Sequence, residues 1–271
     1  MAKIQIKNIL FHKDKEVFYE IERKATSDLI ELHYNQKVQQ NIFRILRRVE
    51  GLQVIVFPIQ DEKLYAFTLF KNSKNFIYIN SYMPLGEQIF AAAHELYHLK
   101  YDLEQKSEIL NDVDSSFNGN ENEMKANSYA ACFLVPKQHL FEEMRLLKIN
   151  KGEIGVLEIL KLVDSFAVPY KAMVLRLYEV NFINLEQAET LLAIPDKSPD
   201  DGVLLLMHQT RYALEWQKRT EEKEYGDLIK YATMNLEDFN LSRNKLKRDF
   251  SILSGDINLD EILMHGEEEK K

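Results

Sequence analysis

The chain has 271 residues, of which 45% are hydrophobic, and this is enough to bury a sizeable core. A formal net charge of −8 argues against a protein that coats nucleic acid, and the single cysteine, Cys132, excludes an intrachain disulfide bond and fits a reducing compartment. The first residues lack the apolar core of a signal peptide, and no apolar stretch is long enough to span a bilayer, so we expect a cytoplasmic protein.

The first part of the chain is predicted to form edge strands, a helix and then a small sheet. Alternating apolar and polar residues between residues 4 and 21 favour one or two edge strands. Residues 26–28, Thr-Ser-Asp, are typical of a helix start, and apolar residues recur at helical spacing over 29–49 until Gly51 ends the helix. Three strand-like runs follow, at 52–59, 64–70 and 75–80.

The next predicted helix carries the most informative residues of the chain. Residues 88–99 read Gln-Ile-Phe-Ala-Ala-Ala-His-Glu-Leu-Tyr-His-Leu and contain an H-E-x-x-H motif at 94–98. Histidines four residues apart lie on one face of a helix, so His94 and His98 can bind the same metal ion. Glu95 lies beside the open coordination position, where a general base is needed, and zinc suits a nitrogen-rich set of ligands. The motif therefore predicts a catalytic zinc site.

A polar stretch at 104–120, rich in Asp, Asn, Ser and Gly, separates this helix from the next. Its composition is typical of a solvated loop, and a lid over the cleft is the alternative.

A catalytic zinc ion usually takes three protein ligands and a water molecule, so a third ligand is expected. Asp102 lies one turn beyond His98 on the same helical face, but three ligands along one straight helix span about 11 Å and cannot converge on one ion. Asp102 is instead a candidate to orient a ligand histidine. Glu121 and Glu123 both begin the next predicted helix, which runs to residue 135, and spacing alone does not choose between them.

The two helices together resemble a known family. The His-Glu-Leu-Tyr-His sequence is followed at 123–136 by Glu-Met-Lys-Ala-Asn-Ser-Tyr-Ala-Ala-Cys-Phe-Leu-Val-Pro. This pair resembles the ImmA/IrrE metallopeptidases, which combine H-E-x-x-H with E-x-x-A-N-x-[FY]-A-A-x-[LF]-[LM]-x-P. The resemblance extends from residue 30 to residue 185 and is strongest at 88–136. It implies an α+β, zincin-like peptidase core, in which a small twisted sheet backs the H-E-x-x-H helix.

The same resemblance implies roles for particular residues. His94, His98 and Glu123 would bind one catalytic Zn²⁺, and Glu95 would be the catalytic base. Asn127 would be a polar residue that supports either a ligand or the packing. Members of the family cleave repressors with helix-turn-helix DNA-binding domains, so the resemblance implies cleavage of an XRE-type repressor and derepression of mobile-element or stress genes. The alternative is a zinc-containing regulatory protein that binds its partner without cutting it.

The rest of the chain is predicted to be mainly helical. Helices at 154–166 and 169–180 have the outline of a helix-turn-helix, but their charges cancel, which favours a structural or substrate-docking role and argues against direct nucleic-acid binding. Residues 184–271 contain a break at 195–202 and no motif for chemistry. The predicted regions are a zinc metallopeptidase core over 1–140, a helix-turn-helix-like region over 141–185 and a C-terminal helical region of unknown role over 186–271.

Overall fold

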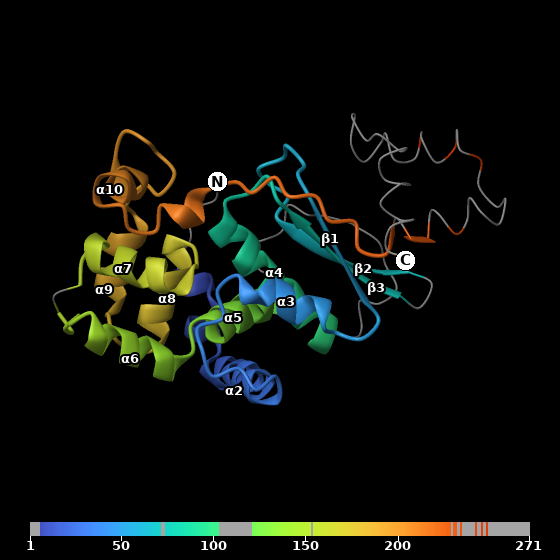
Figure 1. Cartoon of the computed structure of the whole chain (residues 1–271). Coiled ribbons are helices and arrows are strands. Elements are labelled where there is room, and N and C mark those ends of the chain that lie inside the picture. The colour runs from blue at the N-terminus through green and yellow to red at the C-terminus, as the bar shows by residue number, and fades with distance from the viewer. Residues whose placement is uncertain are drawn as a thin grey trace.

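The computed structural model describes residues 6–71, 74–102, 121–152 and 154–228, together with residues 230, 231, 234, 242, 245 and 248. A three-stranded mixed sheet backed by helices is followed by a further group of helices (Figure 1). The expected fold class, an α+β zincin-like core with a helical region after it, is confirmed. The polar stretch predicted at 104–120 lies outside the described residues.

Most of the elements predicted after residue 51 are present within a few residues of their expected bounds. In chain order the elements are η1 (Ile6–Asn8, a 3₁₀ helix), α1 (Leu10–Lys13), α2 (Lys15–Glu31), α3 (Asn41–Arg47), β1 (Leu52–Phe57), β2 (Ala66–Lys71), β3 (Lys74–Asn80), α4 (Leu85–Tyr101), α5 (Glu121–Leu134), α6 (Lys137–Leu146), α7 (Val156–Phe166), α8 (Tyr170–Glu179), α9 (Leu185–Leu192), α10 (Gly202–Thr210) and η2 (Glu215–Gln217, a 3₁₀ helix). Among the described residues, none of these helices has the length and apolar character needed to cross a membrane.

The N-terminal segment forms helices, so the edge strands predicted between residues 4 and 21 are wrong for the part that the structure describes. Asp14 caps α2, because its side chain accepts hydrogen bonds from two backbone N–H groups of the first turn. The alternating pattern requires Tyr19 to face the core, but Tyr19 is 42% exposed. The buried residues of α2 instead recur at helical spacing: Phe18, Ile21, Ala25, Asp28 and Leu29.

The helix start predicted at residues 26–28 is also wrong, since these residues lie in the last turns of α2. Asp28 is 2% exposed and does not cap a helix. Its carboxylate accepts hydrogen bonds from the ammonium group of Lys100 and from the hydroxyls of Tyr101 and Tyr129. Asp28 therefore ties α2 to both α4 and α5.

We expect Asp28→Ala to lower the free energy of unfolding by about 3 kcal/mol, because it leaves a lysine and two tyrosine hydroxyls without their shared acceptor. Glu31→Ala is the matched control, because Glu31 also pairs with Lys100, at 3.6 Å, but its side chain is 73% exposed. Loss of such a surface pair costs less than about 1 kcal/mol. Urea denaturation of the two variants checks this, and equal losses would show that burial of Asp28 is unimportant.

The sheet has the strand order β1-β3-β2 and combines two kinds of pairing. β1 and β3 are parallel, with Val54 opposite Ile77, whereas β3 and β2 are antiparallel, with Ile77 opposite Thr68. α4 packs against β2 and β3. Within the described ranges β2 pairs with a strand on one side alone, so its other side is an edge of the sheet.

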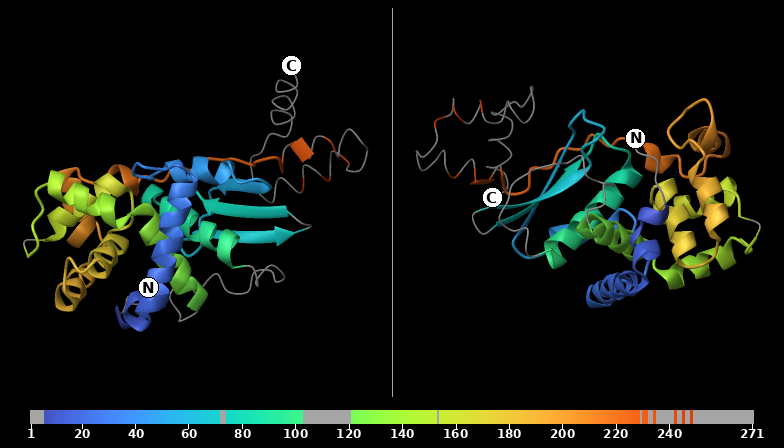
Figure 2. Two further views of the ribbon diagram at one scale, coloured as in Figure 1. Left: turned by 90° about the horizontal axis from the view of Figure 1, so that it is seen from below. Right: turned by 180° about the vertical axis from the view of Figure 1, so that it is seen from behind.

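The chain after η2 returns to the sheet in an extended path, which the prediction of a mainly helical C-terminal region did not include (Figure 2). Glu224 exchanges two backbone hydrogen bonds with Val56 of β1, at 2.9 and 2.7 Å. Upstream, the carbonyl of Lys218 accepts from the N–H of Leu85, at the start of α4. Residues 218–224 therefore run from the start of α4 to the outer edge of β1. α9 and α10, by contrast, are helical as expected, with the predicted break between them.

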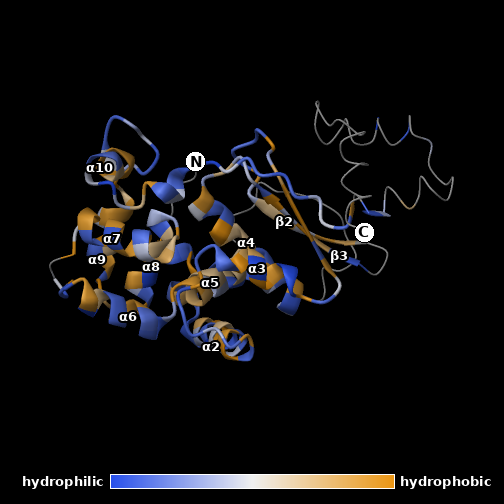
Figure 3. Cartoon of the chain, in the orientation of Figure 1, coloured by the Kyte–Doolittle hydropathy of each residue, from blue (hydrophilic) through white to orange (hydrophobic). Residues whose placement is uncertain are grey.

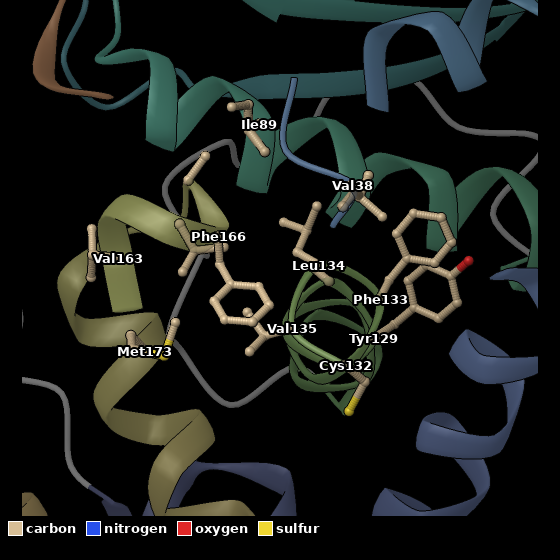
Figure 4. Packing of buried hydrophobic residues seen from close by; sticks show 14 of the residues in the cluster. Val38, Ile89, Tyr129, Cys132, Phe133, Leu134, Val135, Val163, Phe166 and Met173 are labelled. Atoms are coloured by element: carbon tan, nitrogen blue, oxygen red, sulfur yellow. The ribbon is translucent and has the colours of Figure 1, made fainter. Parts of the chain in front are cut away.

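The core is one continuous cluster of buried residues that extends from Ile6 to Ala213. α5 lies within it and contacts α2, α4 and α8. Figure 4 shows Phe166 and Val135 between α5 and the α7–α8 pair. The outer helices α2 and α6 carry both hydrophobic and hydrophilic residues, as expected of helices with one face on the core (Figure 3). The division of the chain at residues 140 and 185 stays a prediction.

The α7–α8 pair is bonded into this core through Arg176, whose side chain is 1% exposed. Its guanidinium group pairs with Glu22 of α2 at 2.6 Å and Glu179 of α8 at 3.3 Å, and donates to the carbonyl oxygen of Val135 at 3.0 Å. Arg176 therefore fixes one face of α8 against α2 and the end of α5, and the structural or substrate-docking role of the α7–α8 pair stays a prediction.

Candidate metal centre

Two histidines of α4 lie at the junction of α4 and α5. Ala91, Ala92 and Ala93, one turn earlier, are at most 8% exposed, because this helix packs between the sheet and α5. The side chains of His94 and His98 are 14% and 13% exposed, so both are largely shielded but reachable from solvent. The helical period places the two imidazoles one above the other, as the sequence predicts.

Glu123, in the first turn of α5, places its carboxylate against both imidazoles. Its Oε2 lies 3.1 Å from Nε2 of His94, and its Oε1 lies 3.4 Å from Nε2 of His98. The two Nε2 atoms are 3.1 Å apart. A zinc tetrahedron with bonds of about 2.0–2.1 Å has edges of about 3.3 Å, so these separations are those of three ligands around one ion. The donor set and its spacing therefore fit a metal ion.

The outer nitrogen of each histidine is held by a hydrogen-bond acceptor. Nδ1 of His94 lies 2.9 Å from Oδ1 of Asn127, and Nδ1 of His98 lies 3.1 Å from Oδ2 of Asp102. Because amide and carboxylate oxygens accept hydrogen bonds, each Nδ1 donates, and Nε2 is left as the nitrogen that can offer a lone pair to a metal ion in the cluster. Three electron-pair donors thus converge on one point, and a cation is what stabilises such an arrangement.

The electrostatics of the site favour positive charge. Burial lowers the pKa of His98, but the hydrogen bonds that its ring donates to Glu123 and Asp102, together with the charges of Glu95 and Glu123, outweigh burial and raise this pKa to about 9. For Glu123 burial acts in the opposite direction and raises the pKa. The hydrogen bonds and positive charge of the two histidines outweigh this effect and hold the pKa of Glu123 well below its usual range. A divalent ion bound here would supply the positive charge that this group of side chains favours.

Glu95 contributes no atom to the three-donor cluster, although its charge acts on His98. It is 7% exposed, and its Oε2 accepts a hydrogen bond from the hydroxyl of Thr68, on β2, at 2.7 Å. No sequence signal predicts this contact, because Thr68 is separated from Glu95 by 27 positions and lies on another element.

The other candidate residues, Glu121 and Asp102, lie close to the cluster at the start of α5 and the end of α4. Of the two glutamates that begin α5, only Glu123 reaches the histidines, while Glu121 pairs with Lys125 at 2.5 Å and its side chain is 65% exposed. Asp102, at the C-terminal cap of α4, also accepts a hydrogen bond at 3.4 Å from Asn122. Asp102 therefore links the end of α4 to the start of α5 beside the cluster.

We expect Asp102→Ala to weaken zinc binding by about 10- to 100-fold, because the His98 ring loses the acceptor that fixes its tautomer and orientation. Competition with a chromogenic chelator measures this affinity. Asp61→Ala, in the exposed turn before β2, is the control and is expected to bind zinc as the wild type does. Equal affinities for the Asp102 variant and the control would show that this hydrogen bond does not support the site.

Comparison with known proteins agrees with this geometry. Residues 47–178 match the model of the family Peptidase_M78, which is described as the IrrE N-terminal-like domain. The match begins just before β1 and ends within α8, so it contains Glu95 and the whole three-donor cluster. No curated protein matches the chain.

Proposed function

We propose that this chain is a zinc-dependent endopeptidase that cleaves a helix-turn-helix repressor, because residues 47–178 match the IrrE N-terminal-like domain. The observation that carries the proposal is the convergence of two imidazole nitrogens and one carboxylate on a single point. A second carboxylate, that of Glu95, lies outside this set of donors. This division of three ligands and one free base is what hydrolysis by a zinc peptidase requires.

The residues have separate roles in the proposed reaction. His94, His98 and Glu123 would hold the ion, which when bound would lower the pKa of a water molecule and polarise the scissile carbonyl. Glu95 would accept a proton from the attacking water as the oxygen of that water bonds to the carbonyl carbon. It would then give the proton to the amine nitrogen as the C–N bond breaks. Asn127 would keep the ring of His94 oriented throughout.

The position of β2 supports a peptide substrate. β2 is an edge strand among the described residues, it packs on α4, and it carries Thr68 beside the proposed base. An extended peptide that adds to this edge would form backbone hydrogen bonds and pass close to Glu95. Strand addition requires an extended segment, so we propose that cleavage takes place in a linker or loop of the repressor.

The proposal that the substrate is a repressor rests on the family resemblance, and the net charge of −8 supports a protein partner over DNA. Cleavage of such a repressor would derepress its target genes, and because repressors act on DNA in the cytoplasm, we propose that this chain acts there.

The test is incubation of the purified chain with a purified helix-turn-helix repressor, chosen first from the products of the neighbouring genes, with and without a chelator. We expect two fragments that are absent with the chelator and return when Zn²⁺ is added in excess. Co-elution of two uncut chains would contradict the peptidase and support a regulatory protein that binds without cutting.

A further inference from the structure

Thr68 provides the contact between the sheet and the proposed general base. Its Oγ1 lies 2.7 Å from Oε2 of Glu95 and 3.5 Å from the backbone oxygen of the same residue. Thr68 is partly buried on β2, and Glu95 is 7% exposed on the face of α4 toward that strand. Because a carboxylate can only accept a hydrogen bond, the hydroxyl is the donor.

This hydrogen bond restricts a side chain that the helix alone leaves free to rotate. The backbone of α4 fixes the direction of Cβ, but the carboxylate of Glu95 can still turn about three side-chain bonds. The donor is itself well fixed, since Thr68 pairs with Ile77 in the ladder and a β-branched residue has a restricted χ1. A rigid donor therefore holds one oxygen of a carboxylate that has little contact with solvent.

We propose that Thr68 is a positioning residue for the proposed base Glu95, an inference that rests on the proposed function. The hydroxyl holds Oε2, which leaves Oε1 to accept the proton of the attacking water and later to release it to the leaving amine nitrogen. The same strand, β2, would pair with the extended substrate. The catalytic base and the scissile bond would thus both be positioned by β2, so a shift of this strand would move both of them.

The first test compares two substitutions at this position. Thr68→Val has nearly the same shape but no hydroxyl, and we expect its kcat to fall about tenfold while KM stays within about twofold, because a hydrogen bond to a charged group is lost. Thr68→Ser retains the hydroxyl, and we expect it to recover most of the kcat. If Thr68→Val has the kcat of the wild type, or if Thr68→Ser is as slow as Thr68→Val, the inference is overturned.

The second test requires no activity. Unfolding free energies of metal-free wild type, Thr68→Val, Glu95→Ala and the double variant form a double-mutant cycle. We expect the double variant to lose less stability than the sum of the two single losses, because both single substitutions break the same hydrogen bond. Strictly additive losses would overturn the inference even if Thr68→Val is slow. If the wild type cleaves no repressor, the proposed function is overturned and the positioning role with it. Non-additive losses in the double-mutant cycle would in that case still show the hydrogen bond between Thr68 and Glu95.

Discussion

Replacing Glu95 with glutamine is expected to abolish peptide cleavage while the metal stays bound. Glutamine has the size of glutamate, so it fits between α4 and β2, and its carbonyl oxygen can still accept the hydrogen bond of Thr68. An amide cannot take a proton from water at neutral pH, so the general-base step is lost. We expect kcat to fall by about 100- to 10,000-fold.

Fragment formation measured by liquid chromatography, together with elemental analysis of zinc, checks both parts of this expectation. Glu121→Gln is the matched control, because it makes the same chemical change at an exposed glutamate outside the cluster. The control should cleave at the rate of the wild type with the same zinc content. Cleavage retained in Glu95→Gln would rule out the general-base role, and loss of zinc from that variant would show that Glu95 is a ligand.

Replacing Glu123 with alanine is expected to remove the zinc. Its two carboxylate oxygens are the only non-histidine donors in the cluster that the described residues form, and α5 offers no second carboxylate at this position. We expect the affinity for zinc to fall by more than about 100-fold, which exceeds the effect expected for the residues that only orient the ligands.

Glu121→Ala tests this assignment, because spacing in the sequence does not separate Glu121 from Glu123. Dialysis followed by elemental analysis should find one zinc ion per chain in Glu121→Ala and none in Glu123→Ala. The opposite result, with stoichiometric zinc in Glu123→Ala and loss in Glu121→Ala, would mean that the third ligand has been assigned to the wrong glutamate.

The part of the site that can be predicted from the sequence is the part encoded over short distances. His94 and His98 are one helical turn apart, and the alanines before them favour a helix, so their common face follows from the period alone. The choice between Glu121 and Glu123 does not follow in this way. It depends on the rotation of α5 about its axis, which is set by the packing of α5 against α2 and α4.

Contacts between distant segments account for what the sequence does not reveal. The sequence pattern around Thr68 predicts a strand, but it does not predict that Thr68 contacts Glu95 on α4. Likewise, Glu224 pairs with β1 although a single bridge leaves no periodic pattern. At the N-terminus the apolar residues between 4 and 21 fit the period of two that is typical of a strand. The structure shows instead that Asp14 caps a helix and that the buried residues of α2 recur at helical spacing.

A zinc titration of metal-free protein tests the central claim most directly. The rate of repressor cleavage is measured after stepwise addition of Zn²⁺ to the wild type. If His94, His98 and Glu123 form one catalytic site, the rate should rise from zero in proportion to added zinc and reach its plateau at one ion per chain. Full activity in the metal-free protein, or no activity after one zinc ion has bound to every chain, would contradict a zinc-dependent peptidase.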